Sequence, residues 1–258
     1  MQTAETSVLL KAENVTLSFE GLTAVNNVSL EVMADKITAL IGPNGAGKTT
    51  FFNLISGIYK PDKGTITFDH QRIDGKKGYQ INEAGISRTY QVINLFRKMS
   101  VIDNVMVGMH SRLHSDYFSD LFRTAKERKE EREAYDRAYK LLNFVGLKNR
   151  ATDAAGSLPY GEQRLLEIVR GLASSPKLLL LDEPAAGMNS QEKRDLDILL
   201  RKIMERNVAI LMIEHDMDLI MDVADDIFVL NHGQLLAEGT PSEIQHDPEV
   251  ITAYLGGD

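Results

Sequence analysis

One stretch of the sequence decides the fold, Ile37-Thr-Ala-Leu-Ile41 followed at once by Gly42-Pro-Asn-Gly-Ala-Gly-Lys-Thr49. The first five residues form a continuous apolar run, which is typical of a strand buried on both faces of a parallel sheet. The next eight match the phosphate-loop pattern Gly-x4-Gly-Lys-Thr. Its glycines allow backbone N–H groups to curl around an anion, and the helix that follows adds its positive N-terminal end. The stretch therefore predicts a strand, a phosphate-binding loop and a helix.

Two further apolar runs, 178–181 and 208–213, have the same continuous character. Helices are expected after the three runs at 47–58, 190–206 and 216–224. Alternation of strand and helix predicts an α/β fold. The opening segment 8–32 instead alternates apolar and polar residues, and with 64–68 it predicts a half-exposed antiparallel sheet. Residues 91–158 are dense in helical patterns and charge, so a helical insert is expected within the α/β frame.

Two acids end the second apolar run, in Leu178-Leu-Leu-Leu-Asp182-Glu183. Ligands of open α/β sheets bind at the carboxyl ends of the strands, where these side chains would lie. We expect Asp182 to hold Mg²⁺ through water and Glu183 to polarise an attacking water. In the loop, Lys48 would reach the β- and γ-phosphates and the Thr49 hydroxyl would ligate Mg²⁺. Together these residues predict the hydrolysis of a nucleoside triphosphate.

Composition narrows the classes of partner. The chain has 258 residues, with 29 basic and 37 acidic side chains, and its net charge of −8 disfavours nucleic acid. It has no cysteine, which excludes disulfides and thiolate metal sites, and no metal beyond Mg²⁺ is implied. The quoted apolar runs are far shorter than the roughly 20 residues of a transmembrane helix, and the N-terminus lacks the basic start of a secretory signal. Membrane contact is therefore expected only through partners.

A third motif narrows the class of ATPase. Leu158-Pro-Tyr-Gly-Glu-Gln163 opens a predicted helix and precedes the Asp182-Glu183 strand. In this respect the chain resembles the ATP-binding subunit of an ABC transporter, which carries a Leu-Ser-Gly-Gly-Gln signature here. The resemblance covers nearly the whole chain and implies a RecA-like P-loop core with an antiparallel β edge. The core would comprise 1–90 and 161–239, with a helical subdomain at 91–160 and a helical tail at 240–258.

The resemblance also assigns roles to single residues. Gln91 resembles the glutamine that senses Mg²⁺ or water and links to the membrane subunits, and His215 resembles the switch histidine at the γ-phosphate. Phe19 stands where the family places an aromatic that stacks on adenine. Glu183, His215 and Gln91 are thus the expected catalytic residues, and Thr49, Gln91 and Asp182 the expected Mg²⁺ site. The expected ATP-binding residues are Phe19, Gly42, Asn44, Gly45, Ala46, Gly47, Lys48, Thr49, Thr50, Asp182, Leu158 and Gly161.

The signature departs from the family pattern at three positions. Pro159 replaces the serine, Tyr160 the first glycine and Glu162 the glutamine, so that Leu158, Gly161 and the following Gln163 hold the pattern. Gly161 and the helix N-terminus can still donate backbone N–H groups to a phosphate held by an opposite subunit. A carboxylate beside phosphate is unfavourable unless it points away. Productive contact across a dimer is therefore expected only if Glu162 turns aside.

Several details resemble the branched-chain amino-acid importers, and most closely the larger of their two ATPase subunits. They are Leu158-Pro-Tyr-Gly161, Leu166-Glu-Ile168, Asp182-Glu-Pro-Ala-Ala-Gly187, Ile213-Glu-His-Asp-Met217, the ending from Gly239-Thr-Pro to Ala253-Tyr-Leu-Gly256, and the insert beginning near His110. This resemblance implies a peripheral subunit on the cytoplasmic face of the inner membrane. Its partners would be a second ATPase subunit, identical or not, two permeases and, indirectly, a solute-binding protein.

Other assignments stay open at this point. Related subunits serve urea, amides, other amino acids or lipopolysaccharide export. A soluble, non-transport ABC ATPase is a further alternative, although such proteins usually carry two cassettes or extra domains. A phosphate-loop GTPase is disfavoured because the sequence has no Asn-Lys-x-Asp motif to read guanine.

Overall fold

The computed structural model describes residues 7–109 and 125–255. They form two compact units, each considered by itself below. The first unit comprises Met1–Arg88 and Lys177–Asp258, and the second comprises Thr89–Pro176. The sequence prediction placed the second unit at 91–160, so the observed unit is longer and includes the helix that follows the signature. Most of the insert beginning near His110 lies outside the described residues.

The first unit contains two sheets. A four-stranded antiparallel sheet has the order β2 (Leu22–Met33), β1 (Val8–Phe19), β4 (Lys63–Phe68) and β5 (Gln71–Arg72). A six-stranded sheet has the order β10 (Gln234–Gly239), β9 (Asp226–Asn231), β3 (Ile37–Ile41), β8 (Ala209–Ile213), β7 (Leu178–Asp182) and β6 (Ile86–Arg88). All its pairs are parallel except β9 with β10. The predicted α/β class, with its antiparallel β edge, is confirmed.

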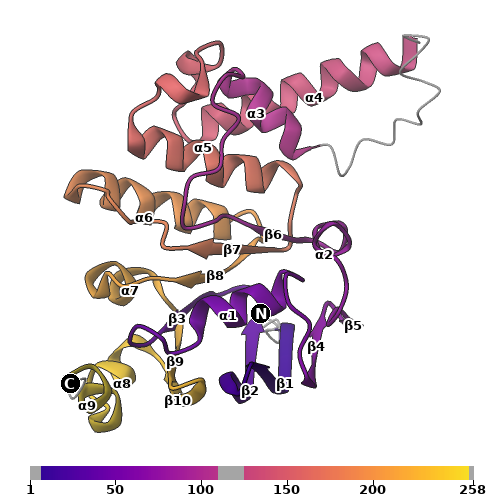
Figure 1. Cartoon of the computed structure of the whole chain (residues 1–258). Coiled ribbons are helices and arrows are strands. Elements are labelled where there is room, and N and C mark those ends of the chain that lie inside the picture. Colours follow the sequence, from indigo (N-terminus) through magenta and orange to yellow (C-terminus); the bar gives the residue numbers. More distant parts are fainter. Residues whose placement is uncertain (1–6, 110–124, 256–258) are drawn as a thin grey trace, which may run out of the picture. The chain divides into compact units, whose positions relative to one another are not determined.

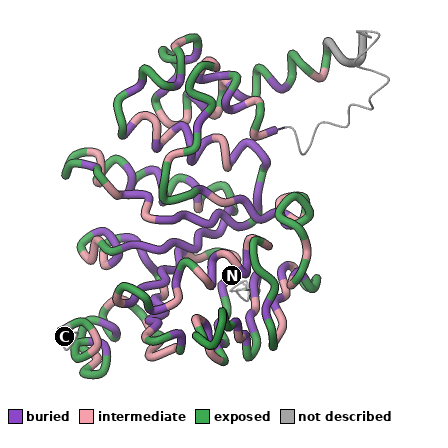
Figure 2. The backbone as a smooth tube through the Cα atoms, viewed as in Figure 1, coloured by how far each residue is buried: buried purple, intermediate pink, exposed green. Residues whose placement is uncertain are grey.

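The three continuous apolar runs form the middle of the parallel sheet. Every residue of β3, β7 and β8 is buried, and Figure 2 shows these strands as unbroken buried segments. Their pairing registers set Leu40 opposite Ile213, and Ile213 opposite Asp182. The carboxyl ends of β3, β7 and β8 therefore lie side by side, which brings together the segments that follow them.

Helices of the first unit follow the strands closely. They are α1 (Lys48–Ile55), α2 (Gly78–Ala84), α6 (Ser190–Met204), α7 (Met217–Val223), α8 (Pro241–Gln245) and α9 (Pro248–Leu255). Figure 1 shows α1 between β3 and the antiparallel strands β1 and β2. Its buried Phe51, Phe52 and Ile55 join the same apolar core as residues of both sheets. This packing fixes the start of α1, and with it the end of the phosphate loop.

The second unit is helical. Its helices are α3 (Val101–Gly108), α4 (Ala125–Phe144) and α5 (Tyr160–Ala173), with short 3₁₀ turns at Lys148–Arg150 and Ala155–Ser157. Val105, Leu142, Leu166 and Val169 belong to one buried cluster with neighbours from all three helices. Because the apolar face of α5 packs into this cluster, α5 belongs to the helical unit and not to the core. None of the helices in the described parts of the chain is long and apolar enough to cross a bilayer.

Candidate nucleotide-binding site

The phosphate loop joins β3 to α1, and its glycines adopt backbone conformations that side chains disfavour. Gly42 has φ +145° and Gly47 has φ +100°. A Cβ atom added to Gly47 would lie 2.4 Å from the carbonyl oxygen of Ala24, and one added to Gly42 would lie 2.0 Å from that of Leu230. The first turn of α1 contains no acidic residue, so no carboxylate of the helix itself competes for its unpaired N–H groups. The loop is thus a backbone cradle suited to an anion.

Lys48 is buried within this cradle. Its ammonium donates hydrogen bonds to the carbonyl oxygens of Gly42, at 2.6 Å, and Pro43, at 2.9 Å. Burial lowers the pKa of Lys48 below its ordinary value, and the negative charges of Glu183 and Asp182 oppose this shift. Asp182 at the end of β7 and Glu183 directly after it therefore act electrostatically on Lys48. Of the other loop residues, Asn44, Gly45 and Thr49 are exposed, Thr50 is half-buried and Ala46 is buried.

Asp182 forms a buried ion pair that the sequence analysis missed. The Nη2 atom of Arg88, at the end of β6, lies 2.9 Å from Oδ2 of Asp182, and both side chains are about 5% exposed. The Nη1 atom of Arg88 donates to Asn53 of α1 and to Ser56, the C-cap residue of that helix. A lone arginine in a short strand carries no recognisable motif. Only the parallel pairing of β6 with β7 sets it beside Asp182.

Glu183 and His215 come together at the carboxyl ends of β7 and β8. The Nε2 atom of His215 lies 2.9 Å from Oε1 of Glu183. Glu183 has φ +49°, a conformation that is costly for a side chain of this size and that clusters at functional sites. Its backbone N–H donates to the carbonyl of Ile213, which ties the two strand ends together. Two of the three predicted catalytic residues are therefore in direct contact.

Glu214 is a second residue that the sequence analysis missed, and its side chain is buried. Its Oε1 atom accepts a hydrogen bond from the N–H of Ala185 at 2.6 Å. Its Oε2 atom accepts from the N–H of His215 at 2.9 Å and of Asp216 at 3.4 Å. One carboxylate thus fastens the loop after Glu183 to the segment that carries His215. The sequence holds a signal for this residue, because Glu214 is an acid that stands between the continuous apolar run 208–213 and His215.

The residues present fit ATP and Mg²⁺. Phe19 is partly exposed at the end of β1, and its ring packs edge-on against Tyr59 with centroids 5.1 Å apart, which leaves an aromatic surface for a base. No group of three or more His, Asp or Glu side chains within 7–109 and 125–255 is arranged to hold a metal ion. Mg²⁺ in nucleotide sites typically uses one or two protein groups plus phosphate oxygens, and Thr49 with Asp182 would supply them.

The C-terminal helix reaches the phosphate loop. Burial raises the pKa of the Tyr254 phenol, and a hydrogen bond from the backbone of Gly42 opposes the shift. Upstream, Thr240 caps α8 through a capping box, with Pro241 in its first turn. The two tail prolines lie at helix starts, where their missing N–H groups are tolerated. Tyr254 therefore lies close to the backbone of the phosphate loop, and the motifs did not reveal this proximity.

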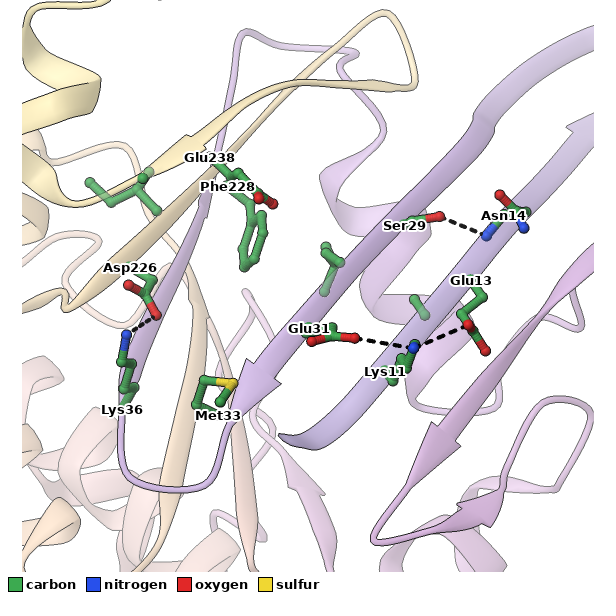
Figure 3. Close-up of a pocket in the computed structure, with 14 residues that line it drawn as sticks. Lys11, Glu13, Asn14, Ser29, Glu31, Met33, Lys36, Asp226, Phe228 and Glu238 are labelled. Carbon is green, nitrogen blue, oxygen red and sulfur yellow. Dashed lines mark hydrogen bonds and ion pairs between the residues drawn. The ribbon is translucent and has the colours of Figure 1, made fainter. Parts of the chain in front are cut away.

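A pocket of about 780 Å³ in the first unit is unrelated to this site. It lies between β1, β2 and the β9–β10 hairpin, as Figure 3 shows. On its wall Lys11 forms ion pairs with Glu13 and Glu31, and Lys36 forms one with Asp226. None of the predicted nucleotide-binding residues lines it.

The remaining predicted residues, Gln91, Leu158 and Gly161, belong to the second unit. Gln91 is exposed, whereas Leu158 and Gly161 are buried at the start of α5. Pro159 is the N-cap residue of α5, and the carbonyl of Leu158 accepts a hydrogen bond from the Gln163 side chain at 2.7 Å.

Two residues that depart from the motifs of the resembled family, Glu162 in the signature and Asn189 after the Asp182-Glu183 strand, have local partners. The Oε2 atom of Glu162 lies 3.5 Å from Nε of Arg150, so its charge is directed toward a cation of its own unit. In the first unit, Asn189 caps α6 by accepting hydrogen bonds from the N–H groups of Gln191 and Glu192. Both substitutions therefore fit the local structure.

Comparison with known proteins gives two family matches. Residues 25–186 match the model described as ABC transporter, and residues 234–258 match the one described as branched-chain amino acid ATP-binding cassette transporter. A high-affinity branched-chain amino acid transport ATP-binding protein, LivG of Salmonella typhimurium, is 48% identical and covers 96% of this chain and 98% of its own length. BraF of Pseudomonas aeruginosa, named in the same way, is 45% identical over the same shares.

Solved structures agree. The crystal structure of a nucleotide-free ATP-binding cassette from an ABC transporter superposes with a TM-score of 0.85 at 31% identity, over 97% of this chain and 100% of the other. A cassette in its ADP conformation gives a TM-score of 0.86 at 32% identity, over 98% and 100%. With the phosphate loop, the Asp182-Glu183 strand and the signature helix in their places, this chain belongs to the ATP-binding subunits of ABC transporters.

Proposed function

We propose that this chain is the ATP-hydrolysing subunit of an importer for branched-chain amino acids. The observation that carries the hydrolytic part is the contact of His215 with Glu183 beside Lys48 and Asp182. The cargo rests on the named relatives and on the match of the C-terminal segment, since no residue of a cytoplasmic motor contacts the transported solute.

In the proposed reaction, the backbone cradle and Lys48 hold the phosphates of ATP, while Phe19 offers a face to the adenine. Glu183 orients a water and accepts its proton as the oxygen attacks the γ-phosphorus and the bond to the β-phosphate oxygen breaks. His215, fixed by Glu214, keeps Glu183 in position and contacts the γ-phosphate. Mg²⁺, bound by Thr49 and Asp182 with Gln91 as a sensor, would neutralise charge on the β- and γ-phosphates.

The proposed partners follow from the same reading. A second ATPase subunit would face this one so that Leu158, Gly161 and the N-terminus of α5 complete the site of the opposite chain. A dimeric bacterial cassette with the same fold, 23% identical, supports such an assembly as a geometry open to this fold. Two permeases would receive the motion, fed by a solute-binding protein. The subunit would act at the cytoplasmic face of the membrane.

The test of hydrolysis is Glu183→Gln in the full-length chain, with Glu205→Gln as the matched control at an exposed acid of the same unit. We expect turnover to fall at least a hundredfold while ATP binding persists, because the amide keeps the shape of the side chain and cannot accept the proton. Hydrolysis at the wild-type rate would refute the role of Glu183.

The transport assignment is tested by purifying the tagged chain from native membranes in mild detergent and identifying the proteins that accompany it. Two polytopic permeases and a second ATPase are expected at comparable amounts. Leucine uptake into vesicles holding that complex, dependent on ATP and on its receptor, would support the cargo. A dimer with no membrane protein would favour a non-transport ATPase.

A further inference from the structure

Arg164 is a fully buried arginine in the signature helix α5, and it holds the backbone of the Gln91 segment. Its Nη1 atom donates to the carbonyl oxygen of Tyr90 at 2.8 Å, and its Nη2 atom to that of Gln91 at 2.8 Å. Nη1 also lies 2.9 Å from Oε2 of Glu167, one turn further along α5. The guanidinium therefore spans two consecutive peptide groups and one carboxylate.

Glu167 and Arg170 extend this contact along the same segment. The N–H of Asn94 donates to Oε1 of Glu167 at 3.4 Å, and the backbone of Tyr90 also hydrogen-bonds to this carboxyl group. The Nη1 atom of Arg170 donates to the carbonyl of Asn94 at 2.5 Å. Arg164, Glu167 and Arg170 of α5 thus hydrogen-bond to the peptide groups of residues 90, 91 and 94.

A gain in stability does not explain why Arg164 and Glu167 are buried as an ion pair. The side chains of Arg164 and Glu167 are 0% and 1% exposed. Burial raises the pKa of Glu167, and the charge of Arg164 opposes the shift. Removing two charges from water costs about as much as their attraction returns, so apolar side chains would stabilise α5 at least as well. What apolar side chains cannot do is bind the carbonyl and N–H groups of a neighbouring loop.

We propose that Arg164 and Glu167 are positioning residues, which clamp the Gln91 segment to the signature helix and thereby fix where the Gln91 side chain is presented. The idea rests on the proposed function, because it assigns the clamp to the glutamine of that same site. The signature helix and the Gln91 segment then move as one body. A displacement imposed on either by a partner is passed to the other without a change in its backbone hydrogen bonds.

The first test is a mutant cycle on ATP hydrolysis by the full-length chain. Arg164→Met/Glu167→Met removes the clamp while keeping unbranched side chains of similar length, and Gln91→Ala removes the residue that it positions. We expect kcat of the double variant to fall about ten- to hundredfold, with the ATP dissociation constant unchanged within about twofold. Because the pair acts through Gln91, the triple variant should be no slower than Gln91→Ala alone. Losses that multiply in the triple variant would overturn the proposal.

Hydrogen exchange supplies a readout that needs no turnover. In the double variant the amides of residues 90–94 should exchange at least tenfold faster, while those of α3 keep their protection. Arg137→Met is the matched control, since the exposed Arg137 lies in the same unit and donates to the hydroxyl of the exposed Ser175. Unchanged exchange at 90–94 would overturn the clamp. If Glu183→Gln hydrolyses ATP normally, the proposed function fails. Hydrogen exchange at residues 90–94 would still show whether Arg164 and Glu167 hold the Gln91 segment.

Discussion

Replacing Glu214 by glutamine should loosen the contact between Glu183 and His215. The carboxylate accepts hydrogen bonds from the N–H groups of Ala185 and His215, one on each oxygen. A glutamine keeps one acceptor and turns an NH₂ group toward the other N–H. An unsatisfied buried donor costs about 1–3 kcal/mol, and exchange of a charged for a neutral acceptor adds about 1 kcal/mol. The expected loss of stability is therefore about 2–4 kcal/mol.

For a chain of this size each kcal/mol corresponds to roughly 2–4 °C of melting temperature, so Glu214→Gln should lower it by roughly 5–15 °C. The thermal transition of the purified chain measures this, with the exposed Glu205→Gln as control. Below the new transition, kcat for ATP hydrolysis should fall while the affinity for ATP stays constant, because Glu214 hydrogen-bonds to Ala185, His215 and Asp216, which lie outside the phosphate loop. A shift smaller than 2 °C would show that the buried carboxylate does not hold the two loops.

Three further changes test other parts of the site. Gly47→Ala forces a Cβ atom against a backbone carbonyl at a positive φ, so nucleotide binding in a fluorescence titration should be lost even where the variant folds. Asp182→Asn leaves Arg88 buried without its carboxylate and should cost about 3–5 kcal/mol in chemical denaturation, whereas Arg88→Met/Asp182→Leu should recover most stability without recovering turnover. The ion pair with Lys193 holds the pKa of Asp216 below its ordinary value, so its stabilisation is complete above about pH 4 and is lost as the pH falls through the depressed pKa. Asp216→Asn should flatten the decline of melting temperature below about pH 4, and an unchanged slope would contradict this assignment.

The parts of the site that sequence could predict are those that a local pattern specifies. The phosphate loop needs glycines at fixed spacing, and Asp182 and Glu183 follow an apolar run. Each pattern can therefore be recognised within a single segment. The antiparallel edge could be predicted for the same reason, since alternation of apolar and polar residues along β1 and β2 indicates strands with one buried face. The sequence analysis assigned separate roles to Glu183 and His215, and the structure shows that the two side chains are in contact.

What sequence could not predict depends on register and on packing between distant segments. Arg88 lies beside Asp182 because β6 adds to the edge of the sheet next to β7. The sequence analysis placed the residues after 160 in the core, but Leu166 and Val169 of α5 pack with residues of α3 and α4, so α5 belongs to the helical unit. The hydrogen bonds from Arg164 to the Gln91 segment join residues more than 70 positions apart, and no sequence spacing predicts such a contact.

The central place of β3 in its sheet has a consequence for how the chain matures during translation. Its neighbours on either side, β8 and β9, begin at Ala209 and Asp226, so they leave the ribosome long after Ile41 does. At about 5–20 residues per second this delay is on the order of ten to thirty seconds. Throughout that interval an apolar strand and the loop behind it have no native neighbours in their sheet. A nascent chain released before its last quarter is made should therefore depend on chaperones and retain no nucleotide.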